Sequence, residues 1–436
     1  MRRLLPGFVE SLQLVEIPEM PEQKLQLIFQ KFSDYARQNL KVNIAKSALE
    51  LSIRLLKRFY PYESFPGKGI RFLSDLISEV GFQADEEPNV GRVPNPADVE
   101  ASTRTPKSEI RNREVLQHFI RRTGLPEVFL RDDLALDQPA LRRFFNQRII
   151  GQEEAVAQLC DIVKVFKAGL NNPYKPITTL IFAGPTWVGK TASALALSQF
   201  FFGQGQRQSP LVRIDMSEFQ HPAQLARFLG AGGEPGKLVA DVRERPFSVL
   251  LLDEAEKADP SIFDAFLTVL DEGMLTDAYG RITNFRNCII ILTTNLGASN
   301  RRSIGYGSEA QGQSDEVYRS AIGKFFRPEF MNRMDGLVVF HSLSQEDIRL
   351  ITLKELEDVK QREGFVKRGL EIHFTENVVS YLAGIGFHEK YGARPLQRAL
   401  EDHVVKPLAN WLLKSKVVEG AKLEVDFVAK LIVRVI

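Results

Sequence analysis

One stretch of this chain has the residue types and spacing of a loop that binds phosphate. Residues 184–191 read Gly-Pro-Thr-Trp-Val-Gly-Lys-Thr, between an apolar run and a helical pattern. In such a loop, backbone N–H groups surround the phosphates, the lysine neutralises the β- and γ-phosphates, and the last hydroxyl binds Mg²⁺. In this context an ordinary glycine turn is a poor alternative. The predicted nucleotide-binding residues are Gly184, Pro185, Thr186, Trp187, Val188, Gly189, Lys190 and Thr191.

Two acids and an amide follow buried strand patterns further along the chain. The segment Ser248–Glu254 reads Ser-Val-Leu-Leu-Leu-Asp-Glu, and residues 293–295 read Thr-Thr-Asn. Beyond a phosphate loop, Asp253 would bind Mg²⁺ through water, and Glu254 would polarise the attacking water. Asn295 would orient the same water if its strand lies beside that of Asp253. These residues predict ATP and Mg²⁺ as cofactors and ATP hydrolysis as the reaction, with Thr191 and Asp253 as the metal-binding residues.

Trp187 departs from the usual pattern, because loops of this kind often have glycine at its position. If the backbone there needs a positive φ, a non-glycine residue costs about 1–2 kcal/mol. The alternative is that the ring lies over the loop surface without strain. We expect nucleotide binding to survive and the rate of hydrolysis to be the property at risk.

Alternating apolar runs and amphipathic patterns predict the elements that position these residues. Expected strands are residues 179–183, 211–215, 248–252 and 287–293, and expected helices are 190–202, 222–229 and 261–270. Continuous apolar strands alternating with helices predict an α/β fold in which helices cover both faces of a parallel sheet.

The flanking segments differ from this central pattern. Residues 21–82 read mostly as helices, and residues 85–108 contain four prolines and few large apolar side chains. We therefore predict a helical subdomain at 1–86, a linker at 87–110, a large α/β ATPase subdomain with leading helices at 111–340, and a small helical lid subdomain with short strands at 341–436.

Composition narrows the classes of partner and compartment. The 436 residues include 57 basic and 55 acidic side chains, so the net charge of +2 favours neither nucleic acid nor an anionic membrane as partner. The two cysteines rule out a disulfide framework, and neither a signal peptide nor a membrane-spanning run is visible. We expect a cytoplasmic protein. The histidines show no metal-ligand spacing, and no Ser/His/Asp arrangement indicates a protease.

Several longer strings are specific enough to indicate a family. They read Arg-Ile-Asp-Met-Ser-Glu-Phe (213–219), Leu-Asp-Glu-Ala-Glu-Lys-Ala (252–258), Leu-Thr-Asp (275–277), Asn-Phe-Arg-Asn (284–287), Thr-Asn-Leu-Gly (294–297) and Phe-Arg-Pro-Glu-Phe-Met-Asn-Arg (326–333). From about Arg148 to the C-terminus, the chain closely resembles the second AAA+ module of the ClpA/ClpB/ClpC unfoldases. Residues 12–82 are similar, less strongly, to the helical subdomain that ends the family's first module.

This resemblance implies an AAA+ P-loop fold and a homo-oligomeric ring, commonly a hexamer, that remodels or unfolds protein substrates as a chaperone. It implies that Arg333 reaches the γ-phosphate of a neighbouring subunit, and that Arg394, in Gly-Ala-Arg-Pro-Leu (392–396), senses the phosphates of its own subunit. It also implies that Ile149 and Ile150 contact adenine; spacing alone is equally compatible with a contact at the start of a helix.

Two features depart from the family, and one further match points to a different role. The loop 229–237 lacks the aromatic residue that grips polypeptide in the central pore, although Tyr279 is a substitute to consider. The chain keeps only the end of a first module, as a truncated, split or diverged member would. Ile304–Tyr306 lies where protease-coupled members dock on a Clp-type protease; we favour an ordinary loop there. Alternative functions are therefore a regulatory subunit of such a protease, or an ATP-binding ring scaffold that threads nothing.

Overall fold

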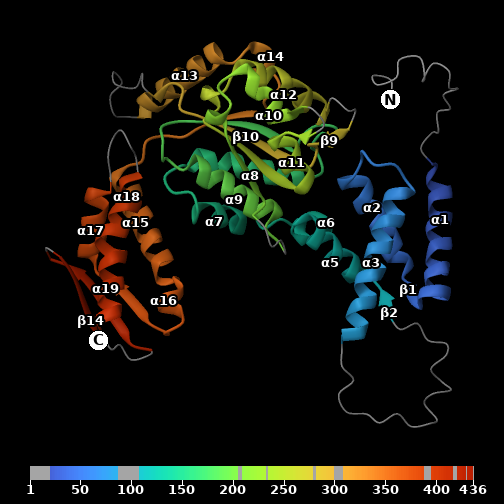
Figure 1. Ribbon diagram of the computed structural model, residues 1–436, viewed down its shortest axis with the longest axis horizontal. Helices are drawn as coiled ribbons and strands as arrows, with labels where there is room; N and C mark the ends of the chain where they lie inside the picture. The colour runs from blue at the N-terminus through green and yellow to red at the C-terminus, as the bar shows by residue number, and fades with distance from the viewer. Residues whose placement is uncertain are drawn as a thin grey trace, which may run out of the picture.

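A central sheet lies between a group of N-terminal helices and a C-terminal subdomain (Figure 1). The computed structural model describes residues 20–86, 108–204, 209–231, 234–277, 281–298, 308–386, 394–415, 420–428 and 430–435. Statements about structure below refer to these residues.

The sheet has five parallel strands in the order β11-β3-β10-β7-β4. The strands are β3 (Thr178–Ala183), β4 (Leu211–Asp215), β7 (Ser248–Asp253), β10 (Cys288–Thr294) and β11 (Gly336–Val339). β3, β7 and β10 are buried along their whole length, which explains their continuous apolar sequences. This confirms the predicted parallel sheet, with strand ends shifted by at most one residue.

Alternate residues of the strands contribute to separate cores on the two faces, as the two-residue period of a strand requires. Ile291 of β10 belongs to one core, and its neighbours Ile290 and Leu292 belong to the other. The first face is covered by α7 (Gln138–Asn146), α8 (Glu153–Lys167) and α9 (Lys190–Phe202). The second face is covered by α10 (Leu225–Leu229), α11 (Lys237–Glu244), α12 (Pro260–Glu272), α13 (Ser308–Phe325) and α14 (Pro328–Met331) (Figure 1). A three-residue 3₁₀ turn, Pro222–Gln224, begins the predicted helix 222–229.

The N-terminal helices form one body with a short parallel strand pair. Its elements are α1 (Glu22–Tyr35), the π-helical turn η1 (Ala36–Leu40), β1 (Val42–Ile44), α2 (Lys46–Phe59), α3 (Gly67–Glu86), β2 (Ser108–Ile110), α5 (Asn112–Thr123) and α6 (Glu127–Leu130). β2 pairs with β1 although it falls inside the predicted linker 87–110. Three-residue strands carry too little periodicity to be recognised in a sequence.

This N-terminal body shares a hydrophobic core with the first face of the sheet. The ring of Tyr60 packs edge-on against Phe247, just before β7, with centroids 5.5 Å apart. The side-chain amide of Asn287, just before β10, donates hydrogen bonds to the Phe59 carbonyl at 2.9 Å and the Tyr62 hydroxyl at 3.0 Å. The helices therefore cover the end of the sheet where these parallel strands begin.

The C-terminal subdomain has its own core. Its elements are α15 (Gln345–Lys360), α16 (Glu363–Val366), β12 (Glu371–Phe374), α17 (Glu376–Ile385), α18 (Arg394–Leu400), η6 (Glu401–Val405), α19 (Lys406–Lys414), β13 (Lys422–Phe427) and β14 (Leu431–Val435). The strands form a sheet of order β12-β13-β14. The last two helices, α18 and α19, are joined by the π-helical turn η6.

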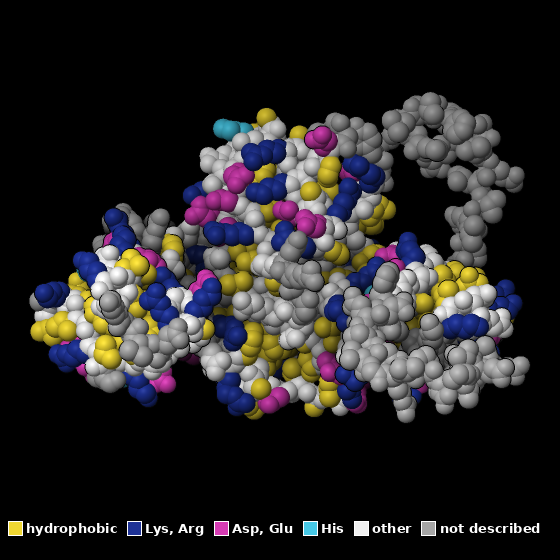
Figure 2. Space-filling model, turned by 60° about the horizontal axis from the view of Figure 1, so that its bottom comes forward, with side chains coloured by type: hydrophobic (Ala, Val, Ile, Leu, Met, Phe, Trp, Pro, Cys, Tyr) yellow, Lys and Arg dark blue, Asp and Glu magenta, His cyan; other side chains and the backbone are white. Residues whose placement is uncertain are grey.

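Basic and acidic side chains are intermingled over the face of the molecule seen in Figure 2. This distribution agrees with the near balance of 57 basic and 55 acidic residues. In the part of the chain that the structure describes, no helix combines the length and apolarity needed to cross a membrane.

Candidate functional site

The predicted phosphate loop joins β3 to α9, at the carboxyl end of a central strand. Gly184 and Gly189 have φ angles of 151° and 110°, which favour glycine. A Cβ atom on Gly184 would also lie 2.4 Å from the carbonyl oxygen of Phe340. Gly189 precedes the first residue of α9, so the N-terminal end of that helix faces the loop.

Trp187 adopts the strained conformation that the sequence raised as a concern. Its φ is 63°, in the left-handed region, where a non-glycine residue costs about 1–2 kcal/mol. The residue is 44% exposed, and it lines the cavity beside the loop. Trp187 therefore has the left-handed backbone conformation, and it also lies at the cavity.

Lys190 is buried and points back into its own loop. Its Nζ donates hydrogen bonds to the carbonyl oxygens of Gly184, at 2.5 Å, and Pro185, at 2.7 Å. A third bond goes to Oδ1 of Asn295 at 2.8 Å. Burial lowers the pKa of Lys190 from 10.5 to about 8, against the opposing effect of nearby acids such as Glu256. A phosphate group would replace these acceptors and favour the charged form.

Asp253 ends β7 with both carboxylate oxygens engaged. Oδ2 accepts hydrogen bonds from Nε and Nη2 of Arg213, at 2.9 and 2.5 Å, and Oδ1 accepts one from the Thr293 hydroxyl. Sequence reasoning missed Arg213; the available signal was a basic residue within a strand that ends beside Asp253. A carboxylate near the hydroxyl of Thr191, which lines the same cavity, is an oxygen donor set that suits Mg²⁺.

Glu254 follows the strand in a left-handed conformation, with φ of 57°. Its N–H donates a hydrogen bond to the Thr293 hydroxyl oxygen at 3.0 Å, and its carboxylate forms an ion pair with Lys257. Thr293 therefore contacts both Asp253 and Glu254. The Glu254 side chain is only partly buried and lines the cavity, where it can reach water.

Asn295 lies beside these acids because β10 pairs with β7. Oε1 of Glu256 accepts hydrogen bonds from the Asn295 N–H at 3.2 Å and from its side-chain amide at 3.1 Å. This contact leaves Oδ1 of Asn295 for Lys190. Glu256 was also missed, although it is the third acid of the string at 252–258. Its other oxygen is buried and accepts no hydrogen bond from the described residues.

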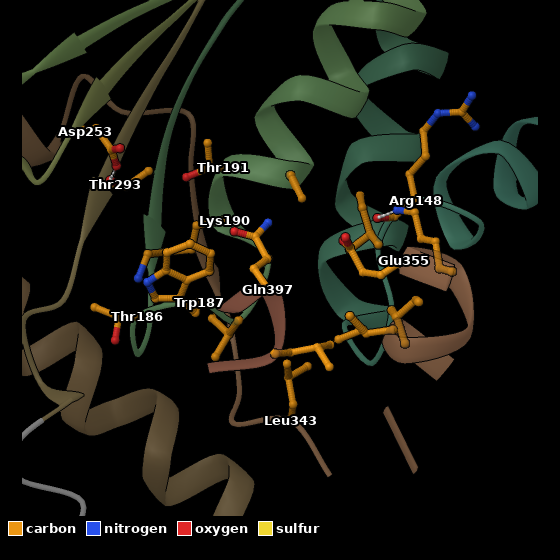
Figure 3. Close-up of a pocket in the computed structure, with 18 of the residues that line it drawn as sticks. Arg148, Thr186, Trp187, Lys190, Thr191, Asp253, Thr293, Leu343, Glu355 and Gln397 are labelled. Atoms are coloured by element: carbon orange, nitrogen blue, oxygen red, sulfur yellow. Dashed lines mark hydrogen bonds between the residues drawn. The ribbon is translucent and has the colours of Figure 1, made fainter. Parts of the chain in front are cut away.

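A cavity of about 540 Å³ extends from the phosphate loop toward the C-terminal subdomain (Figure 3). Its end away from the loop has an apolar lining of Ile149, Ile150, Leu343, Ile351 and Leu396, with Arg148 and Glu355 beside it (Figure 3). Ile149 and Ile150 thus line the cavity, and their contact with adenine stays a prediction. Polar residues that the sequence did not single out also line it: Arg148, Lys354, Glu355 and Gln397. Burial raises the pKa of Glu355. Phosphate-binding groups at one end and apolar groups at the other suit a nucleotide.

The two predicted arginines lie in different places. Arg333 is not among the described residues that line the cavity; its Nε donates to Asp271 at 2.5 Å, and its Nη1 donates to the Glu329 carbonyl at 2.5 Å. Arg394 begins α18, and its side chain is outside the described part of the structure, whereas Gln397, one turn later, lines the cavity. The segment 304–306 and Tyr279 lie outside the described residues.

Two family models match the chain and meet at this cavity. One, described as "AAA domain (Cdc48 subfamily)", matches residues 175–337, and the other, described as "C-terminal, D2-small domain, of ClpB protein", matches residues 343–425. A chaperone protein ClpB that is 36% identical over 73% of this chain decides the family together with these matches. The chain belongs to the Clp family of AAA+ proteins. The predicted family and its α/β P-loop fold with a small C-terminal subdomain are thereby confirmed.

Curated relatives are longer than this Clp-family chain. A chaperone protein ClpB of Rhodopirellula baltica is 36% identical over 326 residues, which cover 73% of this chain and 36% of the relative. An ATP-dependent Clp protease ATP-binding subunit ClpC of Staphylococcus aureus is 31% identical over 438 residues, which cover 88% of this chain and 53% of the relative. The chain thus spans roughly a third to a half of these relatives' length.

Solved Hsp104 structures resemble the whole arrangement. The S. cerevisiae Hsp104–ADP complex matches with a TM-score of 0.76 and 26% identity, over 97% of this chain and 70% of that one. A closed-state Hsp104 with ATPγS and FITC casein matches with a TM-score of 0.71 and 25% identity, over 100% of this chain and 72% of that one. The Clp-family likeness therefore includes the N-terminal helices.

Proposed function

We propose that this Clp-family chain binds ATP with Mg²⁺ and hydrolyses it to remodel protein substrates. The observation that carries the proposal is the convergence of Lys190, Asp253 and Asn295 at one end of a cavity whose other end is apolar. The relatives named above support it, since Hsp104 structures were obtained with ADP and with ATPγS.

Each residue has a separate role in this proposal. Lys190 neutralises phosphate charge, while Thr191 and Asp253 hold the Mg²⁺, which would stabilise negative charge on the phosphates. Glu254 leaves Lys257 to polarise the attacking water. Asn295, fixed by Glu256, orients that water. Arg213 must release Asp253 when the metal binds, because it occupies one of the carboxylate oxygens.

We further propose a closed ring, a hexamer, in which Arg333 completes the site of the next subunit. The supporting observation is that Arg333 lies away from the cavity of its own chain, paired with Asp271. A contact between different surfaces of identical subunits generates a ring when the rotation closes. The arginine then stabilises negative charge on the γ-phosphate in the transition state.

A second function is favoured by the segment that precedes α11. Here β5 (Gly230–Ala231) and β6 (Glu234–Pro235) form a small hairpin, and the loop 229–237 has no aromatic side chain to grip a polypeptide. A ring that binds ATP without threading substrate would fit this loop. Stimulation of ATP hydrolysis by an unfolded polypeptide would support remodelling, and its absence in an active ring would support the scaffold. A Clp-type protease partner stays an alternative: residues 304–306 lie where protease-coupled family members dock, although we favour an ordinary loop there.

Nucleotide binding is testable through the fluorescence of Trp187. The chain has two tryptophans, so Trp411→Phe leaves Trp187 as the single reporter. Because Trp187 lines the cavity and is partly exposed, ATP with Mg²⁺ should displace water from the ring and change its emission. The control, Trp187→Phe, should lose this change. If calorimetry also detects no binding at millimolar ATP, the proposed function is wrong.

The pKa of Lys190 predicts how ATP affinity depends on pH. Without nucleotide this pKa is about 8, and bound phosphate raises it by favouring the charged form. Affinity should therefore be fully present below pH 8 and fall by up to about tenfold per unit above it, until the pKa of the bound state is reached.

Fluorescence titrations at pH 7.5 and 9.5 would measure this dependence. Lys190→Met has no charge to lose, so its weaker affinity should vary much less over the same interval. An equal slope in the wild type and in Lys190→Met would show that another group is responsible.

A further inference from the structure

The side chain of Gln152 joins two backbone segments that belong to different parts of the site. Gln152 directly precedes α8 and is 3% exposed. Its Nε2 donates hydrogen bonds to the carbonyl oxygens of Val188, at 3.2 Å, and His341, at 2.9 Å. Its Oε1 accepts a hydrogen bond from the N–H of His341 at 3.0 Å. The amide therefore uses its carbonyl oxygen and both of its N–H groups.

These two segments are the phosphate loop and the connection to the C-terminal subdomain. Val188 is buried in the loop, two residues before Lys190. His341 belongs to residues 340–344, which connect β11 to α15 and are called the hinge segment below. Leu343 of the hinge segment lines the apolar end of the cavity. One buried side chain thus ties the phosphate-binding end of the site to the segment that carries its apolar end.

The start of the hinge segment has little freedom of its own. The N–H of Phe340 donates a hydrogen bond to the Ala183 carbonyl at 2.7 Å. On the next residue, Gly184, a Cβ atom would lie 2.4 Å from the Phe340 carbonyl oxygen, so the two backbones are in close contact. A rotation of the C-terminal subdomain relative to the sheet therefore has to begin after Phe340, at the residue that Gln152 holds.

Phosphate binding must rearrange the hydrogen bonds of the loop. Lys190 now donates to the Gly184 and Pro185 carbonyls, and it turns to the phosphates when they arrive. The loop N–H groups would bind the same phosphates, and we expect this to shift the peptide that carries the Val188 carbonyl. Buried polar groups are rarely left without partners, so Gln152 has to follow Val188 and move His341 with it.

We propose that Gln152 is a positioning residue that couples occupancy of the phosphate loop to the orientation of the C-terminal subdomain. The coupling rests on the proposed function, because its input is nucleotide binding. Gln152 is not among the described residues that line the cavity, so it acts only through Val188 and His341. Loss of the Gln152 side-chain amide should therefore impair the reorientation of the C-terminal subdomain on ATP binding more than it impairs the binding of ATP itself.

The test compares Gln152→Met with the matched control Gln147→Met. Methionine keeps the unbranched shape of glutamine and suits a buried position, but it neither donates nor accepts strong hydrogen bonds. Gln147 is exposed and lies five positions earlier. Spin labels on cysteines introduced by Glu244→Cys and Lys367→Cys, both at exposed positions, report the distance between sheet and C-terminal subdomain. The native Cys160 and Cys288 are buried, and labelled subunits are diluted with unlabelled ones.

ATP should change the distance in the wild type and in Gln147→Met, and by less than about half as much in Gln152→Met. The kcat of Gln152→Met should fall about tenfold while its KM changes less than about threefold. Gln152→Glu provides a conservative rescue, since a protonated carboxyl has one donor and one acceptor. The distance change that ATP causes in Gln152→Glu should be larger at pH 6, where more of the carboxyl is protonated, than at pH 8. A role in packing alone would not produce this difference.

A wild-type protein that binds no ATP would overturn the proposed function. A wild-type protein that binds ATP without a distance change, or a wild-type response in Gln152→Met, would overturn the coupling alone. Should Gln152→Met fail to fold, hydrogen exchange in the unaltered protein decides. ATP should change exchange of the His341 amide about tenfold or more, and an unchanged rate would reject the proposal.

Discussion

Glu254→Gln should abolish steady-state ATP hydrolysis while ATP stays bound. The amide keeps the size of the side chain, and the backbone hydrogen bond from Glu254 to Thr293 is unaffected. What is lost is the charge that polarises water, and a positioned general base contributes typically 10²–10⁴-fold to a rate. Phosphate release measured beside Trp187 fluorescence should show turnover reduced at least a hundredfold, with affinity equal to or above that of the wild type.

Glu357→Gln is the matched control for this substitution. Glu357 forms an ion pair with Lys360 three residues later, as Glu254 does with Lys257, but it lies on α15 and is exposed. Glu357→Gln removes one negative charge and one ion pair between residues three positions apart, as Glu254→Gln does. ATP turnover of Glu357→Gln should therefore match that of the wild type. Equal turnover in the wild type and in Glu254→Gln would assign the base to another residue.

Arg333→Ala should leave ATP binding intact and reduce turnover by about 10³–10⁵-fold, the range measured for arginine fingers. The reason is geometric. Arg333 is absent from the described lining of its own cavity, so in the proposed ring its contribution is to the site of a neighbouring subunit. Arg349→Ala is the control, because Arg349 pairs with Glu346 and Glu376 inside the C-terminal subdomain. Its turnover should stay close to that of the wild type.

Mixing the two inactive variants tests whether the site is shared between subunits. In a mixed ring, a subunit with Arg333→Ala keeps Glu254, and a neighbour with Glu254→Gln supplies the arginine. Random assembly should restore activity on the order of a quarter of the wild type, because one in four interfaces has the working combination. A mixture as inactive as its components, in rings shown to have exchanged subunits, would place Arg333 outside the shared site.

The central fold could be predicted because the short sequence patterns of the single strands and helices agree with the arrangement of the whole sheet. Strands buried on both faces have continuous apolar sequences, and the phosphate loop has fixed spacing between strand and helix. The conformation of Trp187 could also be anticipated, since a loop that commonly uses glycine at one position often needs positive φ there. These features depend on residues that are close together in the chain.

Other parts of the site depend on contacts between distant residues. Arg213 reaches Asp253 only because β4 pairs with β7, and Glu256 fixes Asn295 only because β10 lies beside β7. Both looked like ordinary charged residues in the sequence. The apolar contribution of Leu343, Ile351 and Leu396 depends on how the C-terminal subdomain sits, which no local pattern encodes.

The shared core at the beginning of the sheet decides where this protein can be cut for laboratory use. Phe247 and Asn287 stand just before two central strands, and both are covered by residues 59–62, at and just after the end of α2. A recombinant fragment that starts at residue 111 would expose the aromatic ring of Phe247 to solvent at the base of the sheet and would leave the Asn287 amide to water. Shorter versions for crystallography or engineering would need a polar replacement at Phe247, or should retain everything from α1 onward.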